Sequence, residues 1–163
     1  MLTVERLREV LAYDPVTGAF TRRVTLGGHR AGATAGALDE RGYCLITIDR
    51  VSYYAHRLAW FYVHGEWPPG DLDHWDTDKS NNRLANLREA TRSQNVANQP
   101  PPRHNTSGYK GVFWSKWHGR WRAYITVNYR RRHLGTFGTA EAAHAAVCAA
   151  ARQSFGEFAR GGA

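Results

Sequence analysis

The chain contains few of the residues that would cross-link it or anchor it. Its 163 residues include only two cysteines, Cys44 and Cys148, which is too few for a four-cysteine zinc site. Both lie among apolar neighbours, so we expect buried free thiols, which suit a reducing cytoplasm. No apolar run approaches the ~18 residues that cross a bilayer. The charged N-terminus has no long apolar core behind it, so we expect a cytoplasmic protein with no membrane partner and no secretory signal.

Acidic residues are scarce in the last third of the chain. Residues 1–99 hold 12 Lys/Arg and 12 Asp/Glu, whereas residues 100–163 hold 10 Lys/Arg and 2 Asp/Glu. The whole formal net charge of +8 therefore belongs to the last third. This asymmetry favours a polyanion-binding module joined to a neutral one, with a merely solvated basic surface as the alternative.

Turn residues and hydrophobic periodicity predict an α+β protein in two domains. Pro100, Pro101 and Pro102 break any helix or strand, so we predict a stiff linker over 100–107 between domains at 1–99 and 108–160. In the first domain we expect helices at 3–12 and 56–64 and strands at 19–24, 43–48 and 51–55, the last two forming a hairpin that turns at Asp49-Arg50. In the second we expect strands at 109–114, 121–127 and 131–137, then a helix capped by Thr139 and stopped by Gly156.

Four residues in the segment 71–98 have side chains suited to phosphodiester hydrolysis. Asp73 offers a carboxylate to a hard divalent cation, and the adjacent His74 offers a general base. Asn86 and Asn95 can orient a histidine or coordinate a metal through their amide oxygens. Adjacent side chains on a strand point in opposite directions, so we expect a bend or loop at Asp73-His74. We expect Asn95 on a short helix with Thr91 as its N-cap.

This segment resembles the HNH homing-type endonucleases. The resemblance rests on His56-Arg57-Leu58, Asp73-His74, Asp76, Asn81-Asn82-Arg83-Leu84, Asn86-Leu87-Arg88 and Asn95, and it extends over most of residues 1–98. It implies a ββα-metal nuclease domain at the N-terminal end, with its core at about 70–98. His74 would be the general base, Asn86 would orient it, and Asp73 with Asn95 would hold one Mg²⁺ or Mn²⁺.

Several other residues of the first domain are weighed against plainer roles. Arg83 and Arg88 are candidates for phosphate contact, or salt-bridge partners instead. We expect Asn81 and Asn82 mainly to make turns. We expect His56 to be a buried, hydrogen-bonded histidine at a helix start rather than a member of the site.

Residues 108–158 resemble the APETALA-type DNA-binding domain of plant ethylene-response factors. The matching pieces are Tyr109-Lys110-Gly111-Val112, Trp121 to Ile125, Leu134 to Phe137, Thr139 to Ala143 and Phe155-Gly156. The resemblance implies a small three-stranded antiparallel sheet packed on one helix, with the open sheet face in the major groove of duplex DNA. The candidate DNA contacts on that face are Lys110, Trp117, Arg122, Tyr124, Arg131 and His133. Such modules occur fused to HNH nucleases in phage and mobile elements.

Together these features predict a metal-dependent DNA endonuclease that nicks duplex DNA with one site per chain. A non-catalytic, sequence-specific DNA-binding regulator on the same scaffold is the alternative, and an RNA-directed enzyme is a third. Both a monomer and a homodimer remain open.

Overall fold

A computed structural model describes residues 1–25, 27–101 and 104–159, and it separates the chain into two compact units, Met1–Glu89 and Ala90–Ala163. Both units mix helices with small sheets, so the expected α+β class is confirmed. The division falls before the proline run that we predicted as the linker. Residues 102–103 of that linker, and residue 160 at the end of the predicted second domain, lie outside the described residues.

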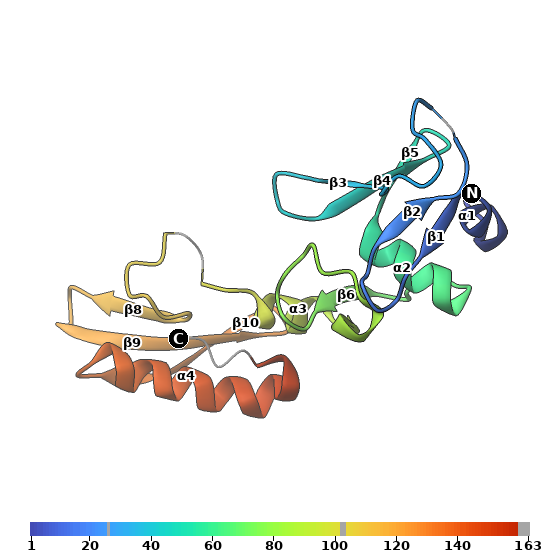
Figure 1. Ribbon diagram of the computed structural model, residues 1–163. Helices are drawn as coiled ribbons and strands as arrows, with labels where there is room; N and C mark the ends of the chain where they lie inside the picture. Colours follow the sequence, from blue (N-terminus) through green and yellow to red (C-terminus); the bar gives the residue numbers. More distant parts are fainter. Residues whose placement is uncertain (26, 102–103, 160–163) are drawn as a thin grey trace. The chain divides into compact units, whose positions relative to one another are not determined.

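The elements follow one another along the chain as labelled in Figure 1. In the first unit they are α1 (Val4–Val10), β1 (Leu11–Tyr13), β2 (Phe20–Arg22), β3 (Ala37–Leu38), β4 (Cys44–Ile48), β5 (Val51–Tyr54), α2 (Ala55–His64), β6 (Asp71–His74), the 3₁₀ turn η1 (Leu84–Asn86) and β7 (Leu87–Ala90), whose last residue opens the second unit. The second unit continues with α3 (Arg92–Asn98), β8 (Val112–Ser115), β9 (Arg120–Val127), β10 (Arg130–Phe137), α4 (Ala140–Phe155) and η2 (Gly156–Phe158).

The first unit packs α1 and α2 with short antiparallel sheets around one apolar core. β1 pairs with β2, and β4 pairs with β3 on one side and β5 on the other. The largest fully buried side chains of this core are Leu7, Leu11, Ile46 and Leu58. The predicted hairpin turn is confirmed, because Asp49 and Arg50 both have positive φ, as a two-residue type I′ turn requires.

Two local predictions for this unit were wrong. The first helix ends at Val10 rather than at residue 12, because the chain continues as strand β1. Asp73 and His74 lie on strand β6, which pairs with β7, and not in a bend. Strand geometry sends the two side chains to opposite faces, and both are buried because protein covers both faces.

The second unit confirms the predicted sheet packed on one helix. Its antiparallel sheet has the strand order β10-β9-β8, and α4 packs against all three strands. The helix begins at Thr139, whose hydroxyl accepts from the backbone N–H of Ala142, and it ends at Gly156. Val112, Ala123, Ala143 and Val147 form the core between sheet and helix, and the open face is opposite.

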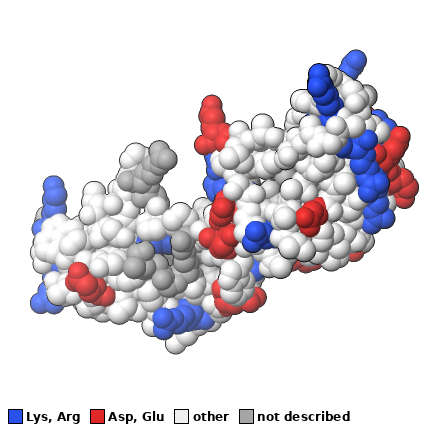
Figure 2. Space-filling model, viewed as in Figure 1, with Lys and Arg blue, Asp and Glu red and all other residues white. Residues whose placement is uncertain are grey.

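Helix α3 belongs to the second unit by its packing. Ala97 on α3 lies against a small apolar cluster that contains Ile125 of β9, Phe155 of α4 and Phe158. No helix in the part of the chain that the structure describes has the length and apolar content to cross a membrane. On the face shown in Figure 2, acidic and basic side chains are interspersed over the first unit, in keeping with its balanced charge.

Candidate functional site

Strand β6 presents the adjacent Asp73 and His74 as buried side chains, 4% and 5% exposed. β6 pairs with β7, and just beyond it the backbone N–H of Trp75 donates to the carbonyl of Asn86 at 2.9 Å. This pairing brings the end of β6 beside η1. Asn86 is therefore brought to the end of β6, although it is distant along the chain, while the side chains of Asp73 and His74 leave that strand on opposite faces.

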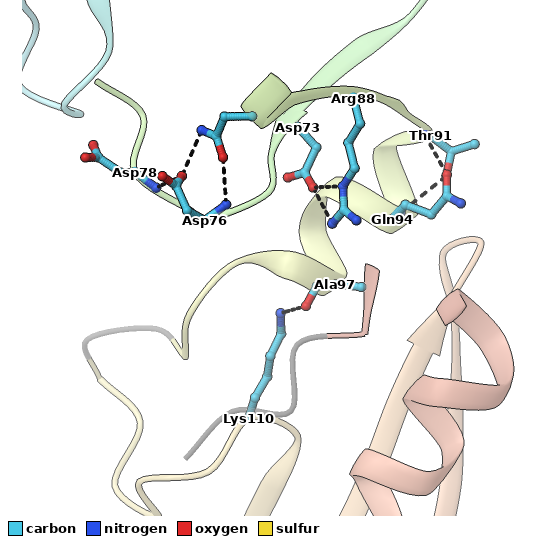
Figure 3. Close-up of polar contacts among 9 residues, drawn as sticks. Asp73, Asp76, Asp78, Arg88, Thr91, Gln94, Ala97 and Lys110 are labelled. Carbon is cyan, nitrogen blue, oxygen red and sulfur yellow. Dashed lines mark hydrogen bonds and ion pairs between the residues drawn. The ribbon is translucent and has the colours of Figure 1, made fainter. Parts of the chain in front are cut away.

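Asp73 is held by an arginine from the partner strand. Both Nε and Nη2 of Arg88 contact Oδ2 of Asp73, at 2.9 and 2.8 Å (Figure 3). The arginine side chain is 14% exposed, and its guanidinium lies 4.4 Å from the ring centre of Trp75. A buried carboxylate requires a compensating positive charge. Arg88 supplies that charge, which is the salt-bridge role weighed for it as the alternative to phosphate contact.

Asn86 braces the loop that follows β6. Its Oδ1 accepts from the backbone N–H of Asp76 at 3.1 Å, and its Nδ2 donates to Asp76 Oδ1 and to the carbonyl of Asn81, both at 2.9 Å. Burial alone would raise the pKa of Asp76, but hydrogen bonds from Asn81 and Asn86 outweigh it and lower that pKa. The amide of Asn86 therefore fixes the loop that leads out of β6 and His74.

His74 lies in an aromatic and amide environment. Its ring centre is 5.1 Å from that of His56 and 6.2 Å from that of Tyr43. Burial lowers the pKa of His74, and it outweighs the opposing influence of the Asn82 amide and of the nearby carboxylates of Asp76 and Asp73. Asn82 is itself buried, and its side chain is the largest of the influences that act against burial on the His74 pKa. The environment therefore favours a neutral imidazole, the form that can accept a proton.

His56 lies at the start of α2 and is buried, as expected, but Nδ1 has no hydrogen bond from any described residue. Burial lowers its pKa to about 3, with smaller contributions in the same direction from His74 and Arg57. The ring instead stacks on Tyr54 at 5.5 Å between centres. The lowered pKa favours an uncharged imidazole, so His56 is a buried neutral ring beside His74.

The N-terminal segment supports this site from outside. The hydroxyl of Tyr13 donates to the carbonyl of Asn82 at 2.7 Å in a buried contact, and burial raises the pKa of Tyr13 to about 12. Gly18, with φ of +76°, approaches so closely that a Cβ would stand 2.5 Å from the backbone nitrogen of Arg83. Only glycine fits there. The turn 14–18 thus fixes the backbone that carries Asn82, while the side chain of Arg83 remains on the exposed surface.

Asn95 is carried by α3 in the second unit, where it is half-buried. The predicted N-cap is confirmed: the Thr91 hydroxyl accepts from the N–H of Gln94, whose side chain accepts from the N–H of Thr91 (Figure 3). Within residues 1–25, 27–101 and 104–159, no three His, Cys, Asp or Glu side chains form a metal-binding group. Of the two predicted metal ligands, Asp73 and Asn95, only Asp73 belongs to these four residue types.

The open face of the C-terminal sheet carries interleaved cations and rings. The Arg131 guanidinium lies 4.0 Å from the ring centre of Tyr124 and 5.0 Å from that of Phe113. Arg122 lies 5.2 Å from the Tyr124 ring, and His133 is 4.9 Å from it between centres. Four of the six predicted DNA-contact residues are therefore brought together on one face.

The other two predicted contacts lie elsewhere. Trp117, in the β8–β9 turn, is 91% exposed and so is presented to solvent. The Lys110 ammonium is directed to the backbone carbonyls of Val96, Ala97 and Gln99, at 2.6, 2.9 and 2.8 Å.

Sequence reasoning missed the proximity of Asn82 and His56 to His74. The adjacency of Asn81 and Asn82 was noticed but interpreted as turn chemistry. No local pattern separates the two asparagines, because the contact that distinguishes Asn82, a hydrogen bond from the Tyr13 hydroxyl to its carbonyl, forms only in the fold. His56 belongs to the segment that resembles the HNH nucleases, but the sequence does not reveal its place beside His74, because that proximity depends on tertiary packing.

Comparison with known proteins agrees with the two sequence resemblances. Residues 53–97 match the family model of the HNH endonuclease, and residues 107–153 match that of the AP2 (APETALA-type) domain, in the expected order. The first match begins at residue 53, so residues 1–52 of the expected nuclease domain lie outside it. The chain is 39% identical to Protein 3.8 of Escherichia phage T7 over 85 residues, which cover 48% of this chain and 70% of that protein. No solved structure matches the chain.

Proposed function

The chain belongs to the HNH endonuclease family, and from this premise we propose that it is a metal-dependent DNA endonuclease that uses His74 as its general base. The HNH and AP2 domains together indicate a DNA nuclease with a DNA-binding module. The observation that carries the finer proposal is the burial of His74 beside Asp73, in surroundings that lower the imidazole pKa. A base that is neutral before the reaction can take the proton of an attacking water.

We propose that several neighbouring residues position the His74 imidazole. Asn82 and Tyr43 limit the movement of the imidazole, and His56 excludes water on one side without adding a charge. Asn86 holds the loop after β6 through Asp76, so it positions His74 through the backbone. This route differs from a direct bond to the imidazole, which the family resemblance implies for Asn86 and which stays a prediction.

The donor atoms suit a hard divalent cation. Asp73 offers a carboxylate, Asn95 an amide oxygen, and Mg²⁺ or Mn²⁺ is the family's expected metal. The Arg88 guanidinium is paired with the buried Asp73 carboxylate, so a metal cation bound there would have to displace it. When bound, such a metal stabilises charge on the phosphate and on the leaving oxygen. The exposed Arg83, and Arg88 if it is released from Asp73, are the proposed phosphate contacts in this domain.

The open face of the C-terminal sheet is the proposed duplex-binding surface. Arg122, Arg131 and His133 supply donors for base edges and phosphates, and Tyr124 holds both arginines in place. Trp117 extends the surface at the β8–β9 turn. One active site per chain leads to nicking, and a double-strand break then requires a homodimer or two successive nicks.

Nicking of supercoiled plasmid tests this function. We expect the wild-type protein to convert supercoiled to open-circular DNA with Mg²⁺ and not with EDTA, and His74→Ala to lose that activity. Both proteins are expected to bind a duplex equally in EDTA, because His74 is remote in sequence from the AP2 domain. Equal binding without any cleavage by either protein would favour a non-catalytic regulator.

A further inference from the structure

Helix α3 is fastened to the C-terminal sheet at both of its ends. At its start, Ser93 Oγ accepts from the backbone N–H of Asn128, in the tight turn between β9 and β10. At its end, the Lys110 ammonium donates to the carbonyls of Val96, Ala97 and Gln99 (Figure 3 shows the contact with Ala97). Between these points Ala97 packs into the apolar cluster with Ile125 and Phe158.

The contacts of Lys110 match what a helix C-terminus needs. The last carbonyls of an α-helix have no partner within the helix, and the negative end of the helix dipole favours a cation there. A lysine ammonium has three N–H donors, and three carbonyl oxygens lie within 2.9 Å of this one. A phosphate contact would require the ammonium to leave these carbonyls.

The backbone that presents Lys110 is itself fixed on the sheet. The N–H of Tyr124 donates to the carbonyl of Gly111 at 2.8 Å. A Cβ on Gly111 would stand 2.4 Å from the carbonyl oxygen of Tyr124, so this approach requires glycine. Tyr124 belongs to the proposed DNA-binding face, and Lys110 therefore extends from the backbone next to β9 to the end of α3.

We propose that Lys110 is a positioning residue that fastens α3, and with it Asn95, to the DNA-binding module. The HNH match runs to residue 97 and so includes all of α3 except its last residue, yet the Lys110 and Asn128 contacts that hold α3 come from the AP2 part of the chain. The C-terminal module thus does more than increase affinity for DNA, because it also sets the orientation of one proposed metal ligand. This inference rests on the proposed function, although the fastening itself can be tested without cleavage.

Lys110→Met tests the proposal, because it keeps the aliphatic length and removes the ammonium. The matched control is Lys116→Met, in the exposed β8–β9 turn of the same module. The first readout is the salt dependence of duplex binding in EDTA. A lysine that contacts a phosphate contributes about 0.9 to the slope of log K against log salt. We expect Lys110→Met to keep the wild-type slope, and a loss of about 0.9 would overturn the proposal in favour of a DNA contact.

The second readout is amide hydrogen exchange in EDTA, which depends on no activity. We expect exchange in the last turn of α3 to rise about tenfold in Lys110→Met, with α4 unchanged, and Lys110→Arg to restore protection because arginine also donates to carbonyls. Unchanged exchange in α3 would refute the fastening.

The third readout separates this proposal from the nuclease function. In single-turnover nicking, Lys110→Met should cut about tenfold more slowly at saturating protein, with an unaltered half-saturation concentration. Nicking at the wild-type rate would overturn the role for Asn95. If the wild-type protein does not nick, the nuclease function fails, while the slope and exchange results still decide whether Lys110 fastens α3.

Discussion

Replacing Arg88 with leucine should destabilise the first unit by removing the guanidinium that pairs with the buried Asp73 carboxylate. The Arg88–Asp73 contacts at 2.8 and 2.9 Å join side chains that are 14% and 5% exposed. Removing one partner from a buried pair costs about 3 kcal/mol, most of it from the charge left behind. We therefore expect Arg88→Leu to lower the free energy of unfolding by about 3 kcal/mol in EDTA, measured by urea denaturation with tryptophan fluorescence.

A double-mutant cycle shows whether the charge is the cause. Asp73→Asn in the Arg88→Leu background removes the buried negative charge, so the double variant should recover about 2 kcal/mol relative to Arg88→Leu alone. Mg²⁺ should also stabilise Arg88→Leu more than the wild type, because in the wild type a cation must first displace the guanidinium. At ten times its dissociation constant, Mg²⁺ adds about 1.4 kcal/mol. A loss below 1 kcal/mol for Arg88→Leu, with no recovery in the double variant, would refute the reasoning.

Three further predictions address other parts of the molecule. The His56 pKa of about 3 lies below its unfolded value of ~6.5, so protonation favours the unfolded chain and stability falls as pH drops from 6.5 toward 3. Between pH 6.5 and 5 the loss in free energy of unfolding is about 2 kcal/mol. Urea titrations should show no such loss in His56→Phe. An equal pH dependence in both proteins would exclude His56 as the source. Arg131→Ala should weaken duplex binding about tenfold in fluorescence anisotropy, whereas Arg152→Ala on α4 should not, and equal losses would argue against the open sheet face. Gly111→Ala should destabilise the second unit by about 2 kcal/mol, because its Cβ would meet the carbonyl of Tyr124, and an unchanged melting temperature would contradict that clash.

The C-terminal sheet and helix could be predicted because local and global signals coincide there. Alternation of Trp121, Ala123 and Ile125 marks one buried face, and Thr139 and Gly156 mark the helix ends. The sequence did not predict strand β6, because its adjacent residues Asp73 and His74 are both polar and both buried. A half-buried strand instead alternates apolar buried residues with polar exposed ones. The burial of such groups depends on partners from elsewhere in the chain, which the local pattern cannot reveal.

The residue types of the candidate site were predictable, but the partnerships were not. Lys110 was grouped with the DNA contacts because it is basic and lies in a basic module. The C-terminal carbonyls of α3 nevertheless compete for its ammonium through tertiary contact. Arg88 was weighed as both phosphate contact and salt-bridge partner, and only the pairing of β6 with β7 brings it to Asp73. The partners of Lys110 and Arg88 thus depend on tertiary contacts, which the spacing of residues in the sequence does not reveal.

Chemical rescue of His74→Ala by imidazole tests the central claim most directly. Removal of the buried ring leaves space for a small base beside Asp73, and the lost proton acceptor can then be supplied from solution. The account predicts that His74→Ala nicks plasmid at least about a hundredfold more slowly than the wild type with Mg²⁺. It also predicts that added imidazole partly restores the rate, in proportion to its neutral form. Nicking by His74→Ala at the wild-type rate without imidazole would contradict the account.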